Sequence, residues 1–181
     1  MGLLSMLFGK HDVSKVARED ADLELIAPIS GTLLPLSEVP DLVISECIVG
    51  DGVAIVPESQ EILAPCDGII TRIISSNNAF AIRSDCGVEV YVTCGIGTKR
   101  FVGEGFYAHV KSGDTVKQGQ KIISVDLNKA MENLQSSVTS LIVIKSSADI
   151  AKVASATGEA KAGETPCTWV ALNHLDPENN E

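Results

Sequence analysis

Two side chains with nucleophilic atoms, Thr93 and Cys94, are neighbours in a stretch of alternating apolar and polar residues. A threonine hydroxyl is hardly ionised at neutral pH and needs an adjacent base before it can attack. The histidines of the chain, His11, His109 and His174, are all distant from Thr93 in the sequence. We therefore expect Thr93 to be a poor nucleophile and each histidine to be a solvated surface residue.

The alternation around Thr93 predicts a β-strand, in which successive side chains point to opposite faces. Tyr91 and Thr93 would share one face, and Val92 and Cys94 the other. If Thr93 faces outward, Cys94 faces the core. A packed, inert thiol is then expected at Cys94, because a buried cysteine behaves as a small hydrophobic residue.

The remainder of the chain also predicts short strands separated by turns. Valine and isoleucine are frequent, aromatic residues make up only 4%, and glycine and proline punctuate the sequence. The expected strands cover residues 23–27, 31–36, 53–56, 61–64, 68–75, 79–83, 88–93, 121–126 and 139–144, and the expected short helices cover 127–136 and 147–156. The fold class is therefore all-β: an antiparallel β-sandwich or barrel-sandwich hybrid with one or two short helices.

An internal repeat supports a duplicated architecture. Residues 25–31 read L-I-A-P-I-S-G and residues 62–68 read I-L-A-P-C-D-G. Each copy predicts a strand that ends at proline, which cannot donate a ladder hydrogen bond, followed by a turn at glycine. Two copies are too few for a solenoid but fit a duplicated hybrid motif.

Residues 110–122 contain G-D-x-V-x-x-G-Q, a pattern similar to hairpins of biotinyl and lipoyl carrier domains. A carrier of that kind presents a lysine at a hairpin tip, in a Met-Lys-Met or Asp-Lys context. Neither dipeptide context occurs here. The similarity therefore concerns the architecture, and covalent cofactor carriage is the least favoured alternative.

Composition excludes several functions. The net charge of −10 and the pI near 4.7 argue against a nucleic-acid binder, because few cations are available for phosphates. Five cysteines without a C-x-x-C pair predict neither a disulfide framework nor a metal site, and favour a reducing cytoplasm. We expect no cofactor and no metal, and a monomer.

The N-terminal residues 1–20 differ from the rest, and we expect a flexible amphipathic segment there, followed by one domain over residues 21–172 and an acidic tail over 173–181. Leu3, Leu4, Leu7 and Phe8 lie at helical spacing, followed by basic residues. Such a segment can lie on an anionic membrane surface at the inner face of the membrane. An inert flexible terminus is the equally weighted alternative.

Several ordered motifs carry a resemblance to a known family. Residues 75–98 read S-S-N-N-A-F-A-I-R-S-D-C-G-V-E-V-Y-V-T-C-G-I-G-T, and residues 103–106 read G-E-G-F. Further matches are V-P-D at 39–41, I-V-G-D-G-V-A-I at 48–55, A-P-C-D-G at 64–68 and G-E-T-P at 163–166. Over residues 23–171 the chain resembles glucose-type enzyme IIA (EIIA type 1) of the bacterial phosphoenolpyruvate-dependent sugar phosphotransferase system.

The resemblance also locates departures from the family pattern. The family reads T-N-H-A-F where this chain has Asn78, and V-H-x-G where it has Thr93; the family aspartate after Gly-Ile is here Gly97. Ser76 stands beside the first of these positions. The resemblance implies that both phosphoryl-transfer histidines are replaced. Imidazole supplies a nucleophile that is neutral near pH 7 and forms a labile bond to phosphorus, which an amide and a hydroxyl do not.

The resemblance further implies a shallow apolar docking face around the family histidines. The matching residues are Leu42, Val43, Ile44, Ile74 and Tyr91. Family members bind the phosphocarrier HPr, sugar permeases and metabolic kinases there. We expect a regulatory, protein-binding pseudoenzyme held in the unphosphorylated state; ordinary core residues at these positions are the alternative. The second expectation is a working phosphoryl relay from HPr to a permease IIB domain.

Overall fold

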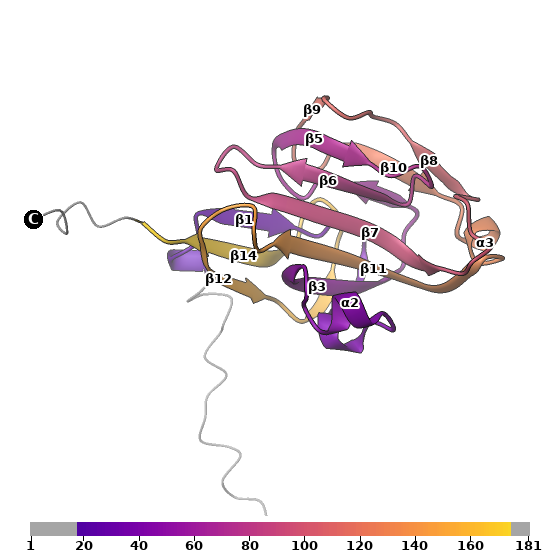
Figure 1. Ribbon diagram of the computed structural model, residues 1–181, viewed down its shortest axis with the longest axis horizontal. Coiled ribbons are helices and arrows are strands. Elements are labelled where there is room, and N and C mark those ends of the chain that lie inside the picture. Colours follow the sequence, from indigo (N-terminus) through magenta and orange to yellow (C-terminus); the bar gives the residue numbers. More distant parts are fainter. Residues whose placement is uncertain (1–17, 175–181) are drawn as a thin grey trace, which may run out of the picture.

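Three antiparallel sheets form the protein in a computed structural model that describes residues 18–174 (Figure 1). The largest has the order β13-β2-β3-β11-β7-β6-β5-β9, and two three-stranded sheets have the orders β1-β14-β12 and β4-β10-β8. The large sheet comprises β2 (Gly31–Pro35), β3 (Gly50–Pro57), β5 (Gly68–Ile73), β6 (Ala79–Arg83), β7 (Glu89–Gly97), β9 (Thr115–Val116), β11 (Leu134–Ile144) and β13 (Gly158–Ala160). The small sheets comprise β1 (Leu23–Ile26), β12 (Ile150–Ser155) and β14 (Pro166–Leu172), and β4 (Glu61–Leu63), β8 (Phe106–Ala108) and β10 (Lys121–Val125).

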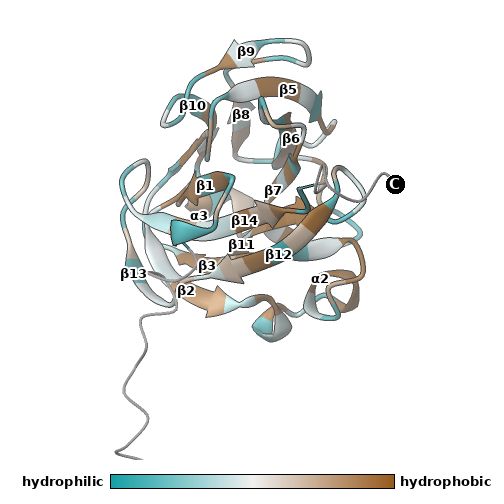
Figure 2. Cartoon of the chain, turned by 90° about the vertical axis from the view of Figure 1, so that its left-hand side faces the viewer, coloured by the Kyte–Doolittle hydropathy of each residue, from teal (hydrophilic) through white to brown (hydrophobic). Residues whose placement is uncertain are grey.

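One hydrophobic core joins the three sheets. It contains Leu25 and Val170 from one small sheet, Ile122 from the other, and Ile82 and Val90 from the large sheet, all fully buried. Hydrophobic residues concentrate in the strands, and the turns between them are mostly hydrophilic (Figure 2). The expected all-β, antiparallel fold class is therefore confirmed.

The internal repeat pairs with itself through the backbone. Ile26 N donates to Pro65 O at 3.0 Å, and Leu63 N donates to Pro28 O at 2.7 Å. Because residues 26 and 63, and 28 and 65, are equivalent in the two copies, this is one contact made twice about a local two-fold axis. Ala27 O and Ala64 O accept in the same way from Gly163 N and Gly119 N, which extends the symmetry to two later turns.

The helices are shorter than expected and differ in position. The predicted helix over 127–136 is only α3 (Leu127–Ala130), and the predicted helix over 147–156 is wrong, because the edge strand β12 occupies it and pairs with β14. An unexpected turn of helix, α2 (Leu42–Ser45), follows the 3-10 turn η1 (Leu36–Glu38). In the described part of the chain no helix is long and apolar enough to cross a membrane.

The proposed membrane contacts Leu3, Leu4, Leu7 and Phe8, together with His11, lie outside the described residues.

Candidate functional site

Asn78 occupies the end of the turn that leads into β6, and both polar ends of its side chain are bonded. Its Nδ2 donates to Cys94 O at 2.9 Å, and its Oδ1 accepts from Ser76 Oγ at 2.6 Å. Only 6% of the residue is exposed. Because both ends of the amide are bonded, the Asn78 side chain holds the turn against β7.

Thr93 lies next to this turn on the outer face of β7. Its strand partners are Ala79 on β6 and Ser140 on β11. Thr93 and Tyr91 are half-buried, whereas Val92 and Cys94 are buried, as the alternation predicts. Burial raises the pKa of Tyr91, and a side-chain hydrogen bond with Thr93 opposes that rise. The side-chain partner of the Thr93 hydroxyl is thus the Tyr91 phenol, and neither of the histidines within residues 18–174 pairs with it.

Cys94 faces the core and is fully buried. Desolvation raises the pKa of its thiol to about 11, and hydrogen bonding to Thr139 opposes this. A thiol of this kind is neutral at physiological pH and inaccessible, which confirms the expectation of a packed cysteine.

A bulge at Gly95 changes the alternation at the end of β7. Gly95 has a φ of +76°, and a Cβ there would lie 2.7 Å from Leu134 Cδ1. The pairing of β11 with β7 shifts register opposite this point, between Ser136 and Thr139. Ile96 therefore joins the outer cluster with Tyr91 instead of the core.

Two further close contacts fix the surroundings of Asn78 and Thr93. A Cβ at Gly97 would lie 2.9 Å from Phe101 Cδ1, so the phenylalanine ring fills the space beside the glycine. Gly103 has a φ of +110°, and a Cβ there would lie 2.6 Å from Ser76 O. The G-E-G-F segment thus lies directly on the turn that carries Asn78.

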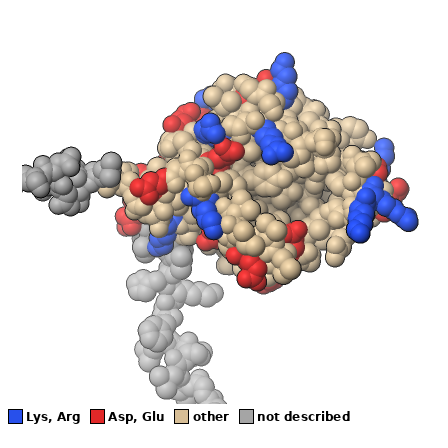
Figure 3. All heavy atoms as spheres, viewed as in Figure 1, with Lys and Arg blue, Asp and Glu red and all other residues tan. Residues whose placement is uncertain are grey.

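Four of the five expected docking residues line one shallow depression of about 390 Å³: Val43, Ile44, Ile74 and Tyr91. The fifth, Leu42, is adjacent on α2 and is 77% exposed. The surface on this side is slightly hollowed, with charged side chains spread around a mainly uncharged area (Figure 3). The structure therefore brings the expected docking residues together at the surface.

The depression also includes residues that the sequence did not single out, namely Val49, Arg72, Ala81, Glu89, Ile142 and Ile144. Ala81, Tyr91 and Ile142 are consecutive partners across β6, β7 and β11, so they form its floor. In the sequence, strand alternation could have indicated that these residues point outward. Without the pairing order, however, those strands could not be brought side by side. Beneath α2, a small cluster with Ala54 and Ile142 supports the rim.

The two described histidines are exposed and do not line this depression. His109 Nε2 lies 2.6 Å from Ser124 Oγ, and His174 Nε2 lies 3.0 Å from Asp22 Oδ1. Within residues 18–174, no group of three or more histidine, cysteine, aspartate or glutamate side chains is arranged to hold a metal ion.

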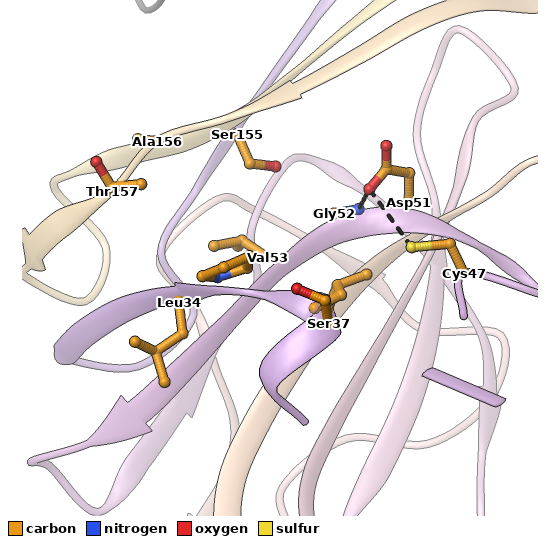
Figure 4. A pocket seen from close by; sticks show the side chains of 11 residues that line it. Leu34, Ser37, Cys47, Asp51, Gly52, Val53, Ser155, Ala156 and Thr157 are labelled. Carbon is orange, nitrogen blue, oxygen red and sulfur yellow. Dashed lines mark hydrogen bonds between the residues drawn. The ribbon is translucent and has the colours of Figure 1, made fainter. Parts of the chain in front are cut away.

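A second pocket, of about 290 Å³, lies between η1, β3 and β12 (Figure 4). Cys47 lines it, with Sγ 3.9 Å from Asp51 Oδ1, which also accepts from Gly52 N. Burial and the Asp51 carboxylate raise the pKa of Cys47. None of the expected site residues lies in this pocket.

Comparison with known proteins identifies the class of protein. The sequence profile of the phosphoenolpyruvate-dependent sugar phosphotransferase system, EIIA 1, matches residues 23–150. The PTS system glucose-specific EIIA component of Haemophilus influenzae is 41% identical over 91% of this chain and 96% of that relative. That of Borreliella burgdorferi is 44% identical over 71% of this chain and 68% of that relative.

A solved structure agrees with the sequence matches. The glucose permease IIA from Mycoplasma capricolum superimposes with a TM-score of 0.73 at 31% identity, covering 81% of this chain and 94% of that one. The fold and the matches together define a component of a sugar phosphotransferase system. The chain belongs to the EIIA 1 family.

Proposed function

We propose that this EIIA protein does not relay phosphoryl groups and acts as a regulatory module that binds protein partners. The observation that carries the proposal is the state of Asn78 and Thr93, the positions where the family motifs have histidine. The Asn78 amide is buried and bonded at both ends. Thr93 has a tyrosine beside it and no described histidine to act as its base.

The chemistry of the two side chains argues in the same direction. An amide cannot carry a proton or a positive charge to stabilise a transferring phosphoryl group. A threonine phosphate ester would be too stable to pass its phosphoryl group onward. The expected aspartate position, Gly97, is covered by Phe101. All three differences fall in the cluster that phosphoryl transfer requires.

The docking face supports the binding half of the proposal. Val43, Ile44, Ile74 and Tyr91 belong to the mainly apolar lining of one depression, which also includes Arg72 and Glu89, and Leu42 is exposed next to it. A surface of this kind fits an HPr-like phosphocarrier, a sugar permease or a metabolic kinase. Unphosphorylated members of the family bind and inhibit such targets, and a member without histidines would remain in that state permanently. We place the protein in the cytoplasm as a monomer, with residues 21–172 as its domain.

The second candidate is a working relay that accepts phosphate from HPr and passes it to a permease IIB domain. The names of its relatives favour it, because several are called PTS system glucose-specific EIIA component at 37–44% identity. It would require an unorthodox phosphoryl acceptor.

The binding proposal is tested by affinity capture with sugar permeases and sugar kinases from the native host. A histidine-bearing relative in its unphosphorylated form serves as the positive control. We expect this chain to bind at least one of the targets that the relative binds, and to remain bound when phosphoenolpyruvate, enzyme I and HPr are added. Absence of binding to every target that the relative captures would refute the regulatory role.

A further inference from the structure

Two cysteines from different turns line one cavity on the side of the fold away from Asn78. Cys66 belongs to the turn between β4 and β5, and Cys86 to the turn between β6 and β7. Both line a cavity of about 270 Å³. Every cysteine is reduced in this structure.

The pairing of β5 with β6 brings the turns that carry the two cysteines to the same end of the sheet. In the antiparallel pair of β5 with β6, Ile69 is the partner of Arg83 and Ile70 of Ile82. Three residues before Ile69 is Cys66, and three residues after Arg83 is Cys86. Both turns therefore leave the paired strands at the same end, where Cys66 and Cys86 line one cavity.

The two thiols differ in how firmly they are held. The turn of Cys66 is fixed by its neighbour Asp67, which accepts from Lys117 Nζ at 2.9 Å and from Gln118 N at 2.8 Å. Cys66 is only 3% exposed. Cys86 is exposed, and its Sγ lies 3.2 Å from Ser84 Oγ, a buried hydroxyl that lines the same cavity. Its side chain thus turns toward the cavity while the residue stays accessible to solvent.

From this geometry we infer that Cys66 and Cys86 are a redox pair that forms an intramolecular disulfide when the protein meets a small-molecule disulfide. The exposed Cys86 thiolate attacks one sulfur of the reagent, which forms a mixed disulfide and releases one small thiol. Cys66 then loses its proton to solvent and attacks the Cys86 sulfur, which releases the second small thiol. Two protein thiols are oxidised, and one reagent disulfide is reduced to two thiols.

The order of the two steps follows from accessibility and acidity. Burial, together with smaller contributions from the nearby Cys86 and the Asp67 and Asp85 carboxylates, raises the pKa of Cys66 to about 12. Cys66 is therefore a poor first nucleophile and acts as the resolving thiol once Cys86 carries the leaving group.

The test uses the full chain, incubated at pH 8 with oxidised glutathione in excess over reduced glutathione. Free thiols are then counted after denaturation, and peptides are mapped without reduction. We expect the protein to lose two of its five thiols and to yield one cross-linked peptide pair that contains Cys66 and Cys86. Five remaining thiols, a lasting glutathione adduct on Cys86, or a disulfide between two chains would each overturn the inference.

Three variants assign the roles. Cys66→Ala should accumulate the glutathione adduct on Cys86, because the resolving thiol is absent, and Cys86→Ser should leave Cys66 reduced. Cys47→Ser is the matched control, since Cys47 is also partly accessible, and it should form the disulfide as the unaltered chain does. Loss of the cross-link in the Cys47 variant would contradict the assignment, and circular dichroism of each variant verifies that it is folded.

Discussion

The side-chain amide of Asn78 donates a hydrogen bond to the backbone carbonyl of Cys94 across 2.9 Å, inside a buried turn. The reverse bond, from Cys94 N to Asn78 O at 2.7 Å, joins the same two residues. Asn78 therefore fastens the start of β6 to β7 beside Thr93. A residue that holds two strands together in this way has a structural task, which is consistent with the proposal that Asn78 takes no part in phosphoryl transfer.

Asn78→Asp should destabilise the protein at neutral pH. An ionised carboxylate cannot donate to Cys94 O, and the buried acceptors would repel each other, at a cost of about 2–3 kcal/mol. The protonated acid can donate, so the folded state should raise the pKa of the new carboxyl. Stability is then highest below the unfolded pKa of about 3.9 and falls as pH rises toward 7. Urea unfolding at several pH values measures this.

Asn77→Asp is the matched control for that substitution. Asn77 has a φ of +57° and is only partly buried, and aspartate tolerates this conformation. The free energy of unfolding of the Asn77→Asp variant should differ from that of the parent by less than about 0.5 kcal/mol at pH 7. Equal effects of the two substitutions would mean that the bond to Cys94 contributes little.

Gly103→Ala should disturb the Asn78 turn more than an equivalent change elsewhere. The added Cβ would lie 2.6 Å from Ser76 O, whereas at Gly113, with φ +97°, nothing lies within 4 Å. Gly113→Ala should cost about 1–2 kcal/mol through backbone conformation alone. Gly103→Ala should cost more, by an amount that thermal unfolding of both variants measures, and similar costs would contradict the close packing.

Val43→Asp should weaken partner binding and leave stability nearly unchanged. Val43 lies in the depression proposed for docking and is 49% exposed. Partner binding would remove water from a carboxylate at this position and bury it against an apolar surface. We expect affinity for a captured partner to fall about tenfold or more. Tyr107→Asp, at a 53% exposed position in the β4-β10-β8 sheet, is the control and should bind normally. Calorimetric titration of both variants compares them.

The buried thiols should make the protein less stable in alkali. Burial raises the pKa of Cys94 to about 11 and that of Cys66 and Cys167 to about 12. An unfolded thiol ionises near pH 8.5. The contribution of each buried thiol to the free energy of unfolding is therefore fully present below that pH. It is lost as the pH rises toward the pKa of the thiol in the folded protein, by about 1.4 kcal/mol per pH unit per thiol.

Urea unfolding between pH 8 and 10 checks this decline. The Cys94→Ala variant should show a shallower decline than the parent, although it starts from a lower stability. Parallel curves for parent and variant would show that Cys94 does not contribute to the pH dependence.

Much of the site could be predicted from local pattern. Alternation along β7 placed Thr93 outward and Cys94 inward, and the repeated A-P-x-x-G turns indicated duplication. Both are properties of a few adjacent residues. The pairing of Ile26 with Pro65, by contrast, depends on the tertiary fold, and no spacing in the sequence shows it.

The failures have a similar cause. Residues 147–156 contain alanine, lysine and isoleucine at helical spacing, but pairing of Lys152 with Ala171 and of Val153 with Val170 overrides that local preference. The one-turn helix α2 is set by Asp41, whose Oδ1 accepts from Val43 N and Ile44 N, and is too short to show a period. Gly95 shifts Ile96 to the outer face, which strict alternation would have placed inside.

The most direct measurement is phosphoryl transfer in a reconstituted system. The purified chain is incubated with labelled phosphoenolpyruvate, enzyme I and HPr, beside a histidine-bearing relative and an Asn78→His, Thr93→His double variant of this chain. We expect label on the relative and none on this chain. The double variant should become labelled if the two imidazoles are all that this chain lacks for phosphoryl transfer. Stable label on the unaltered chain would contradict the proposal.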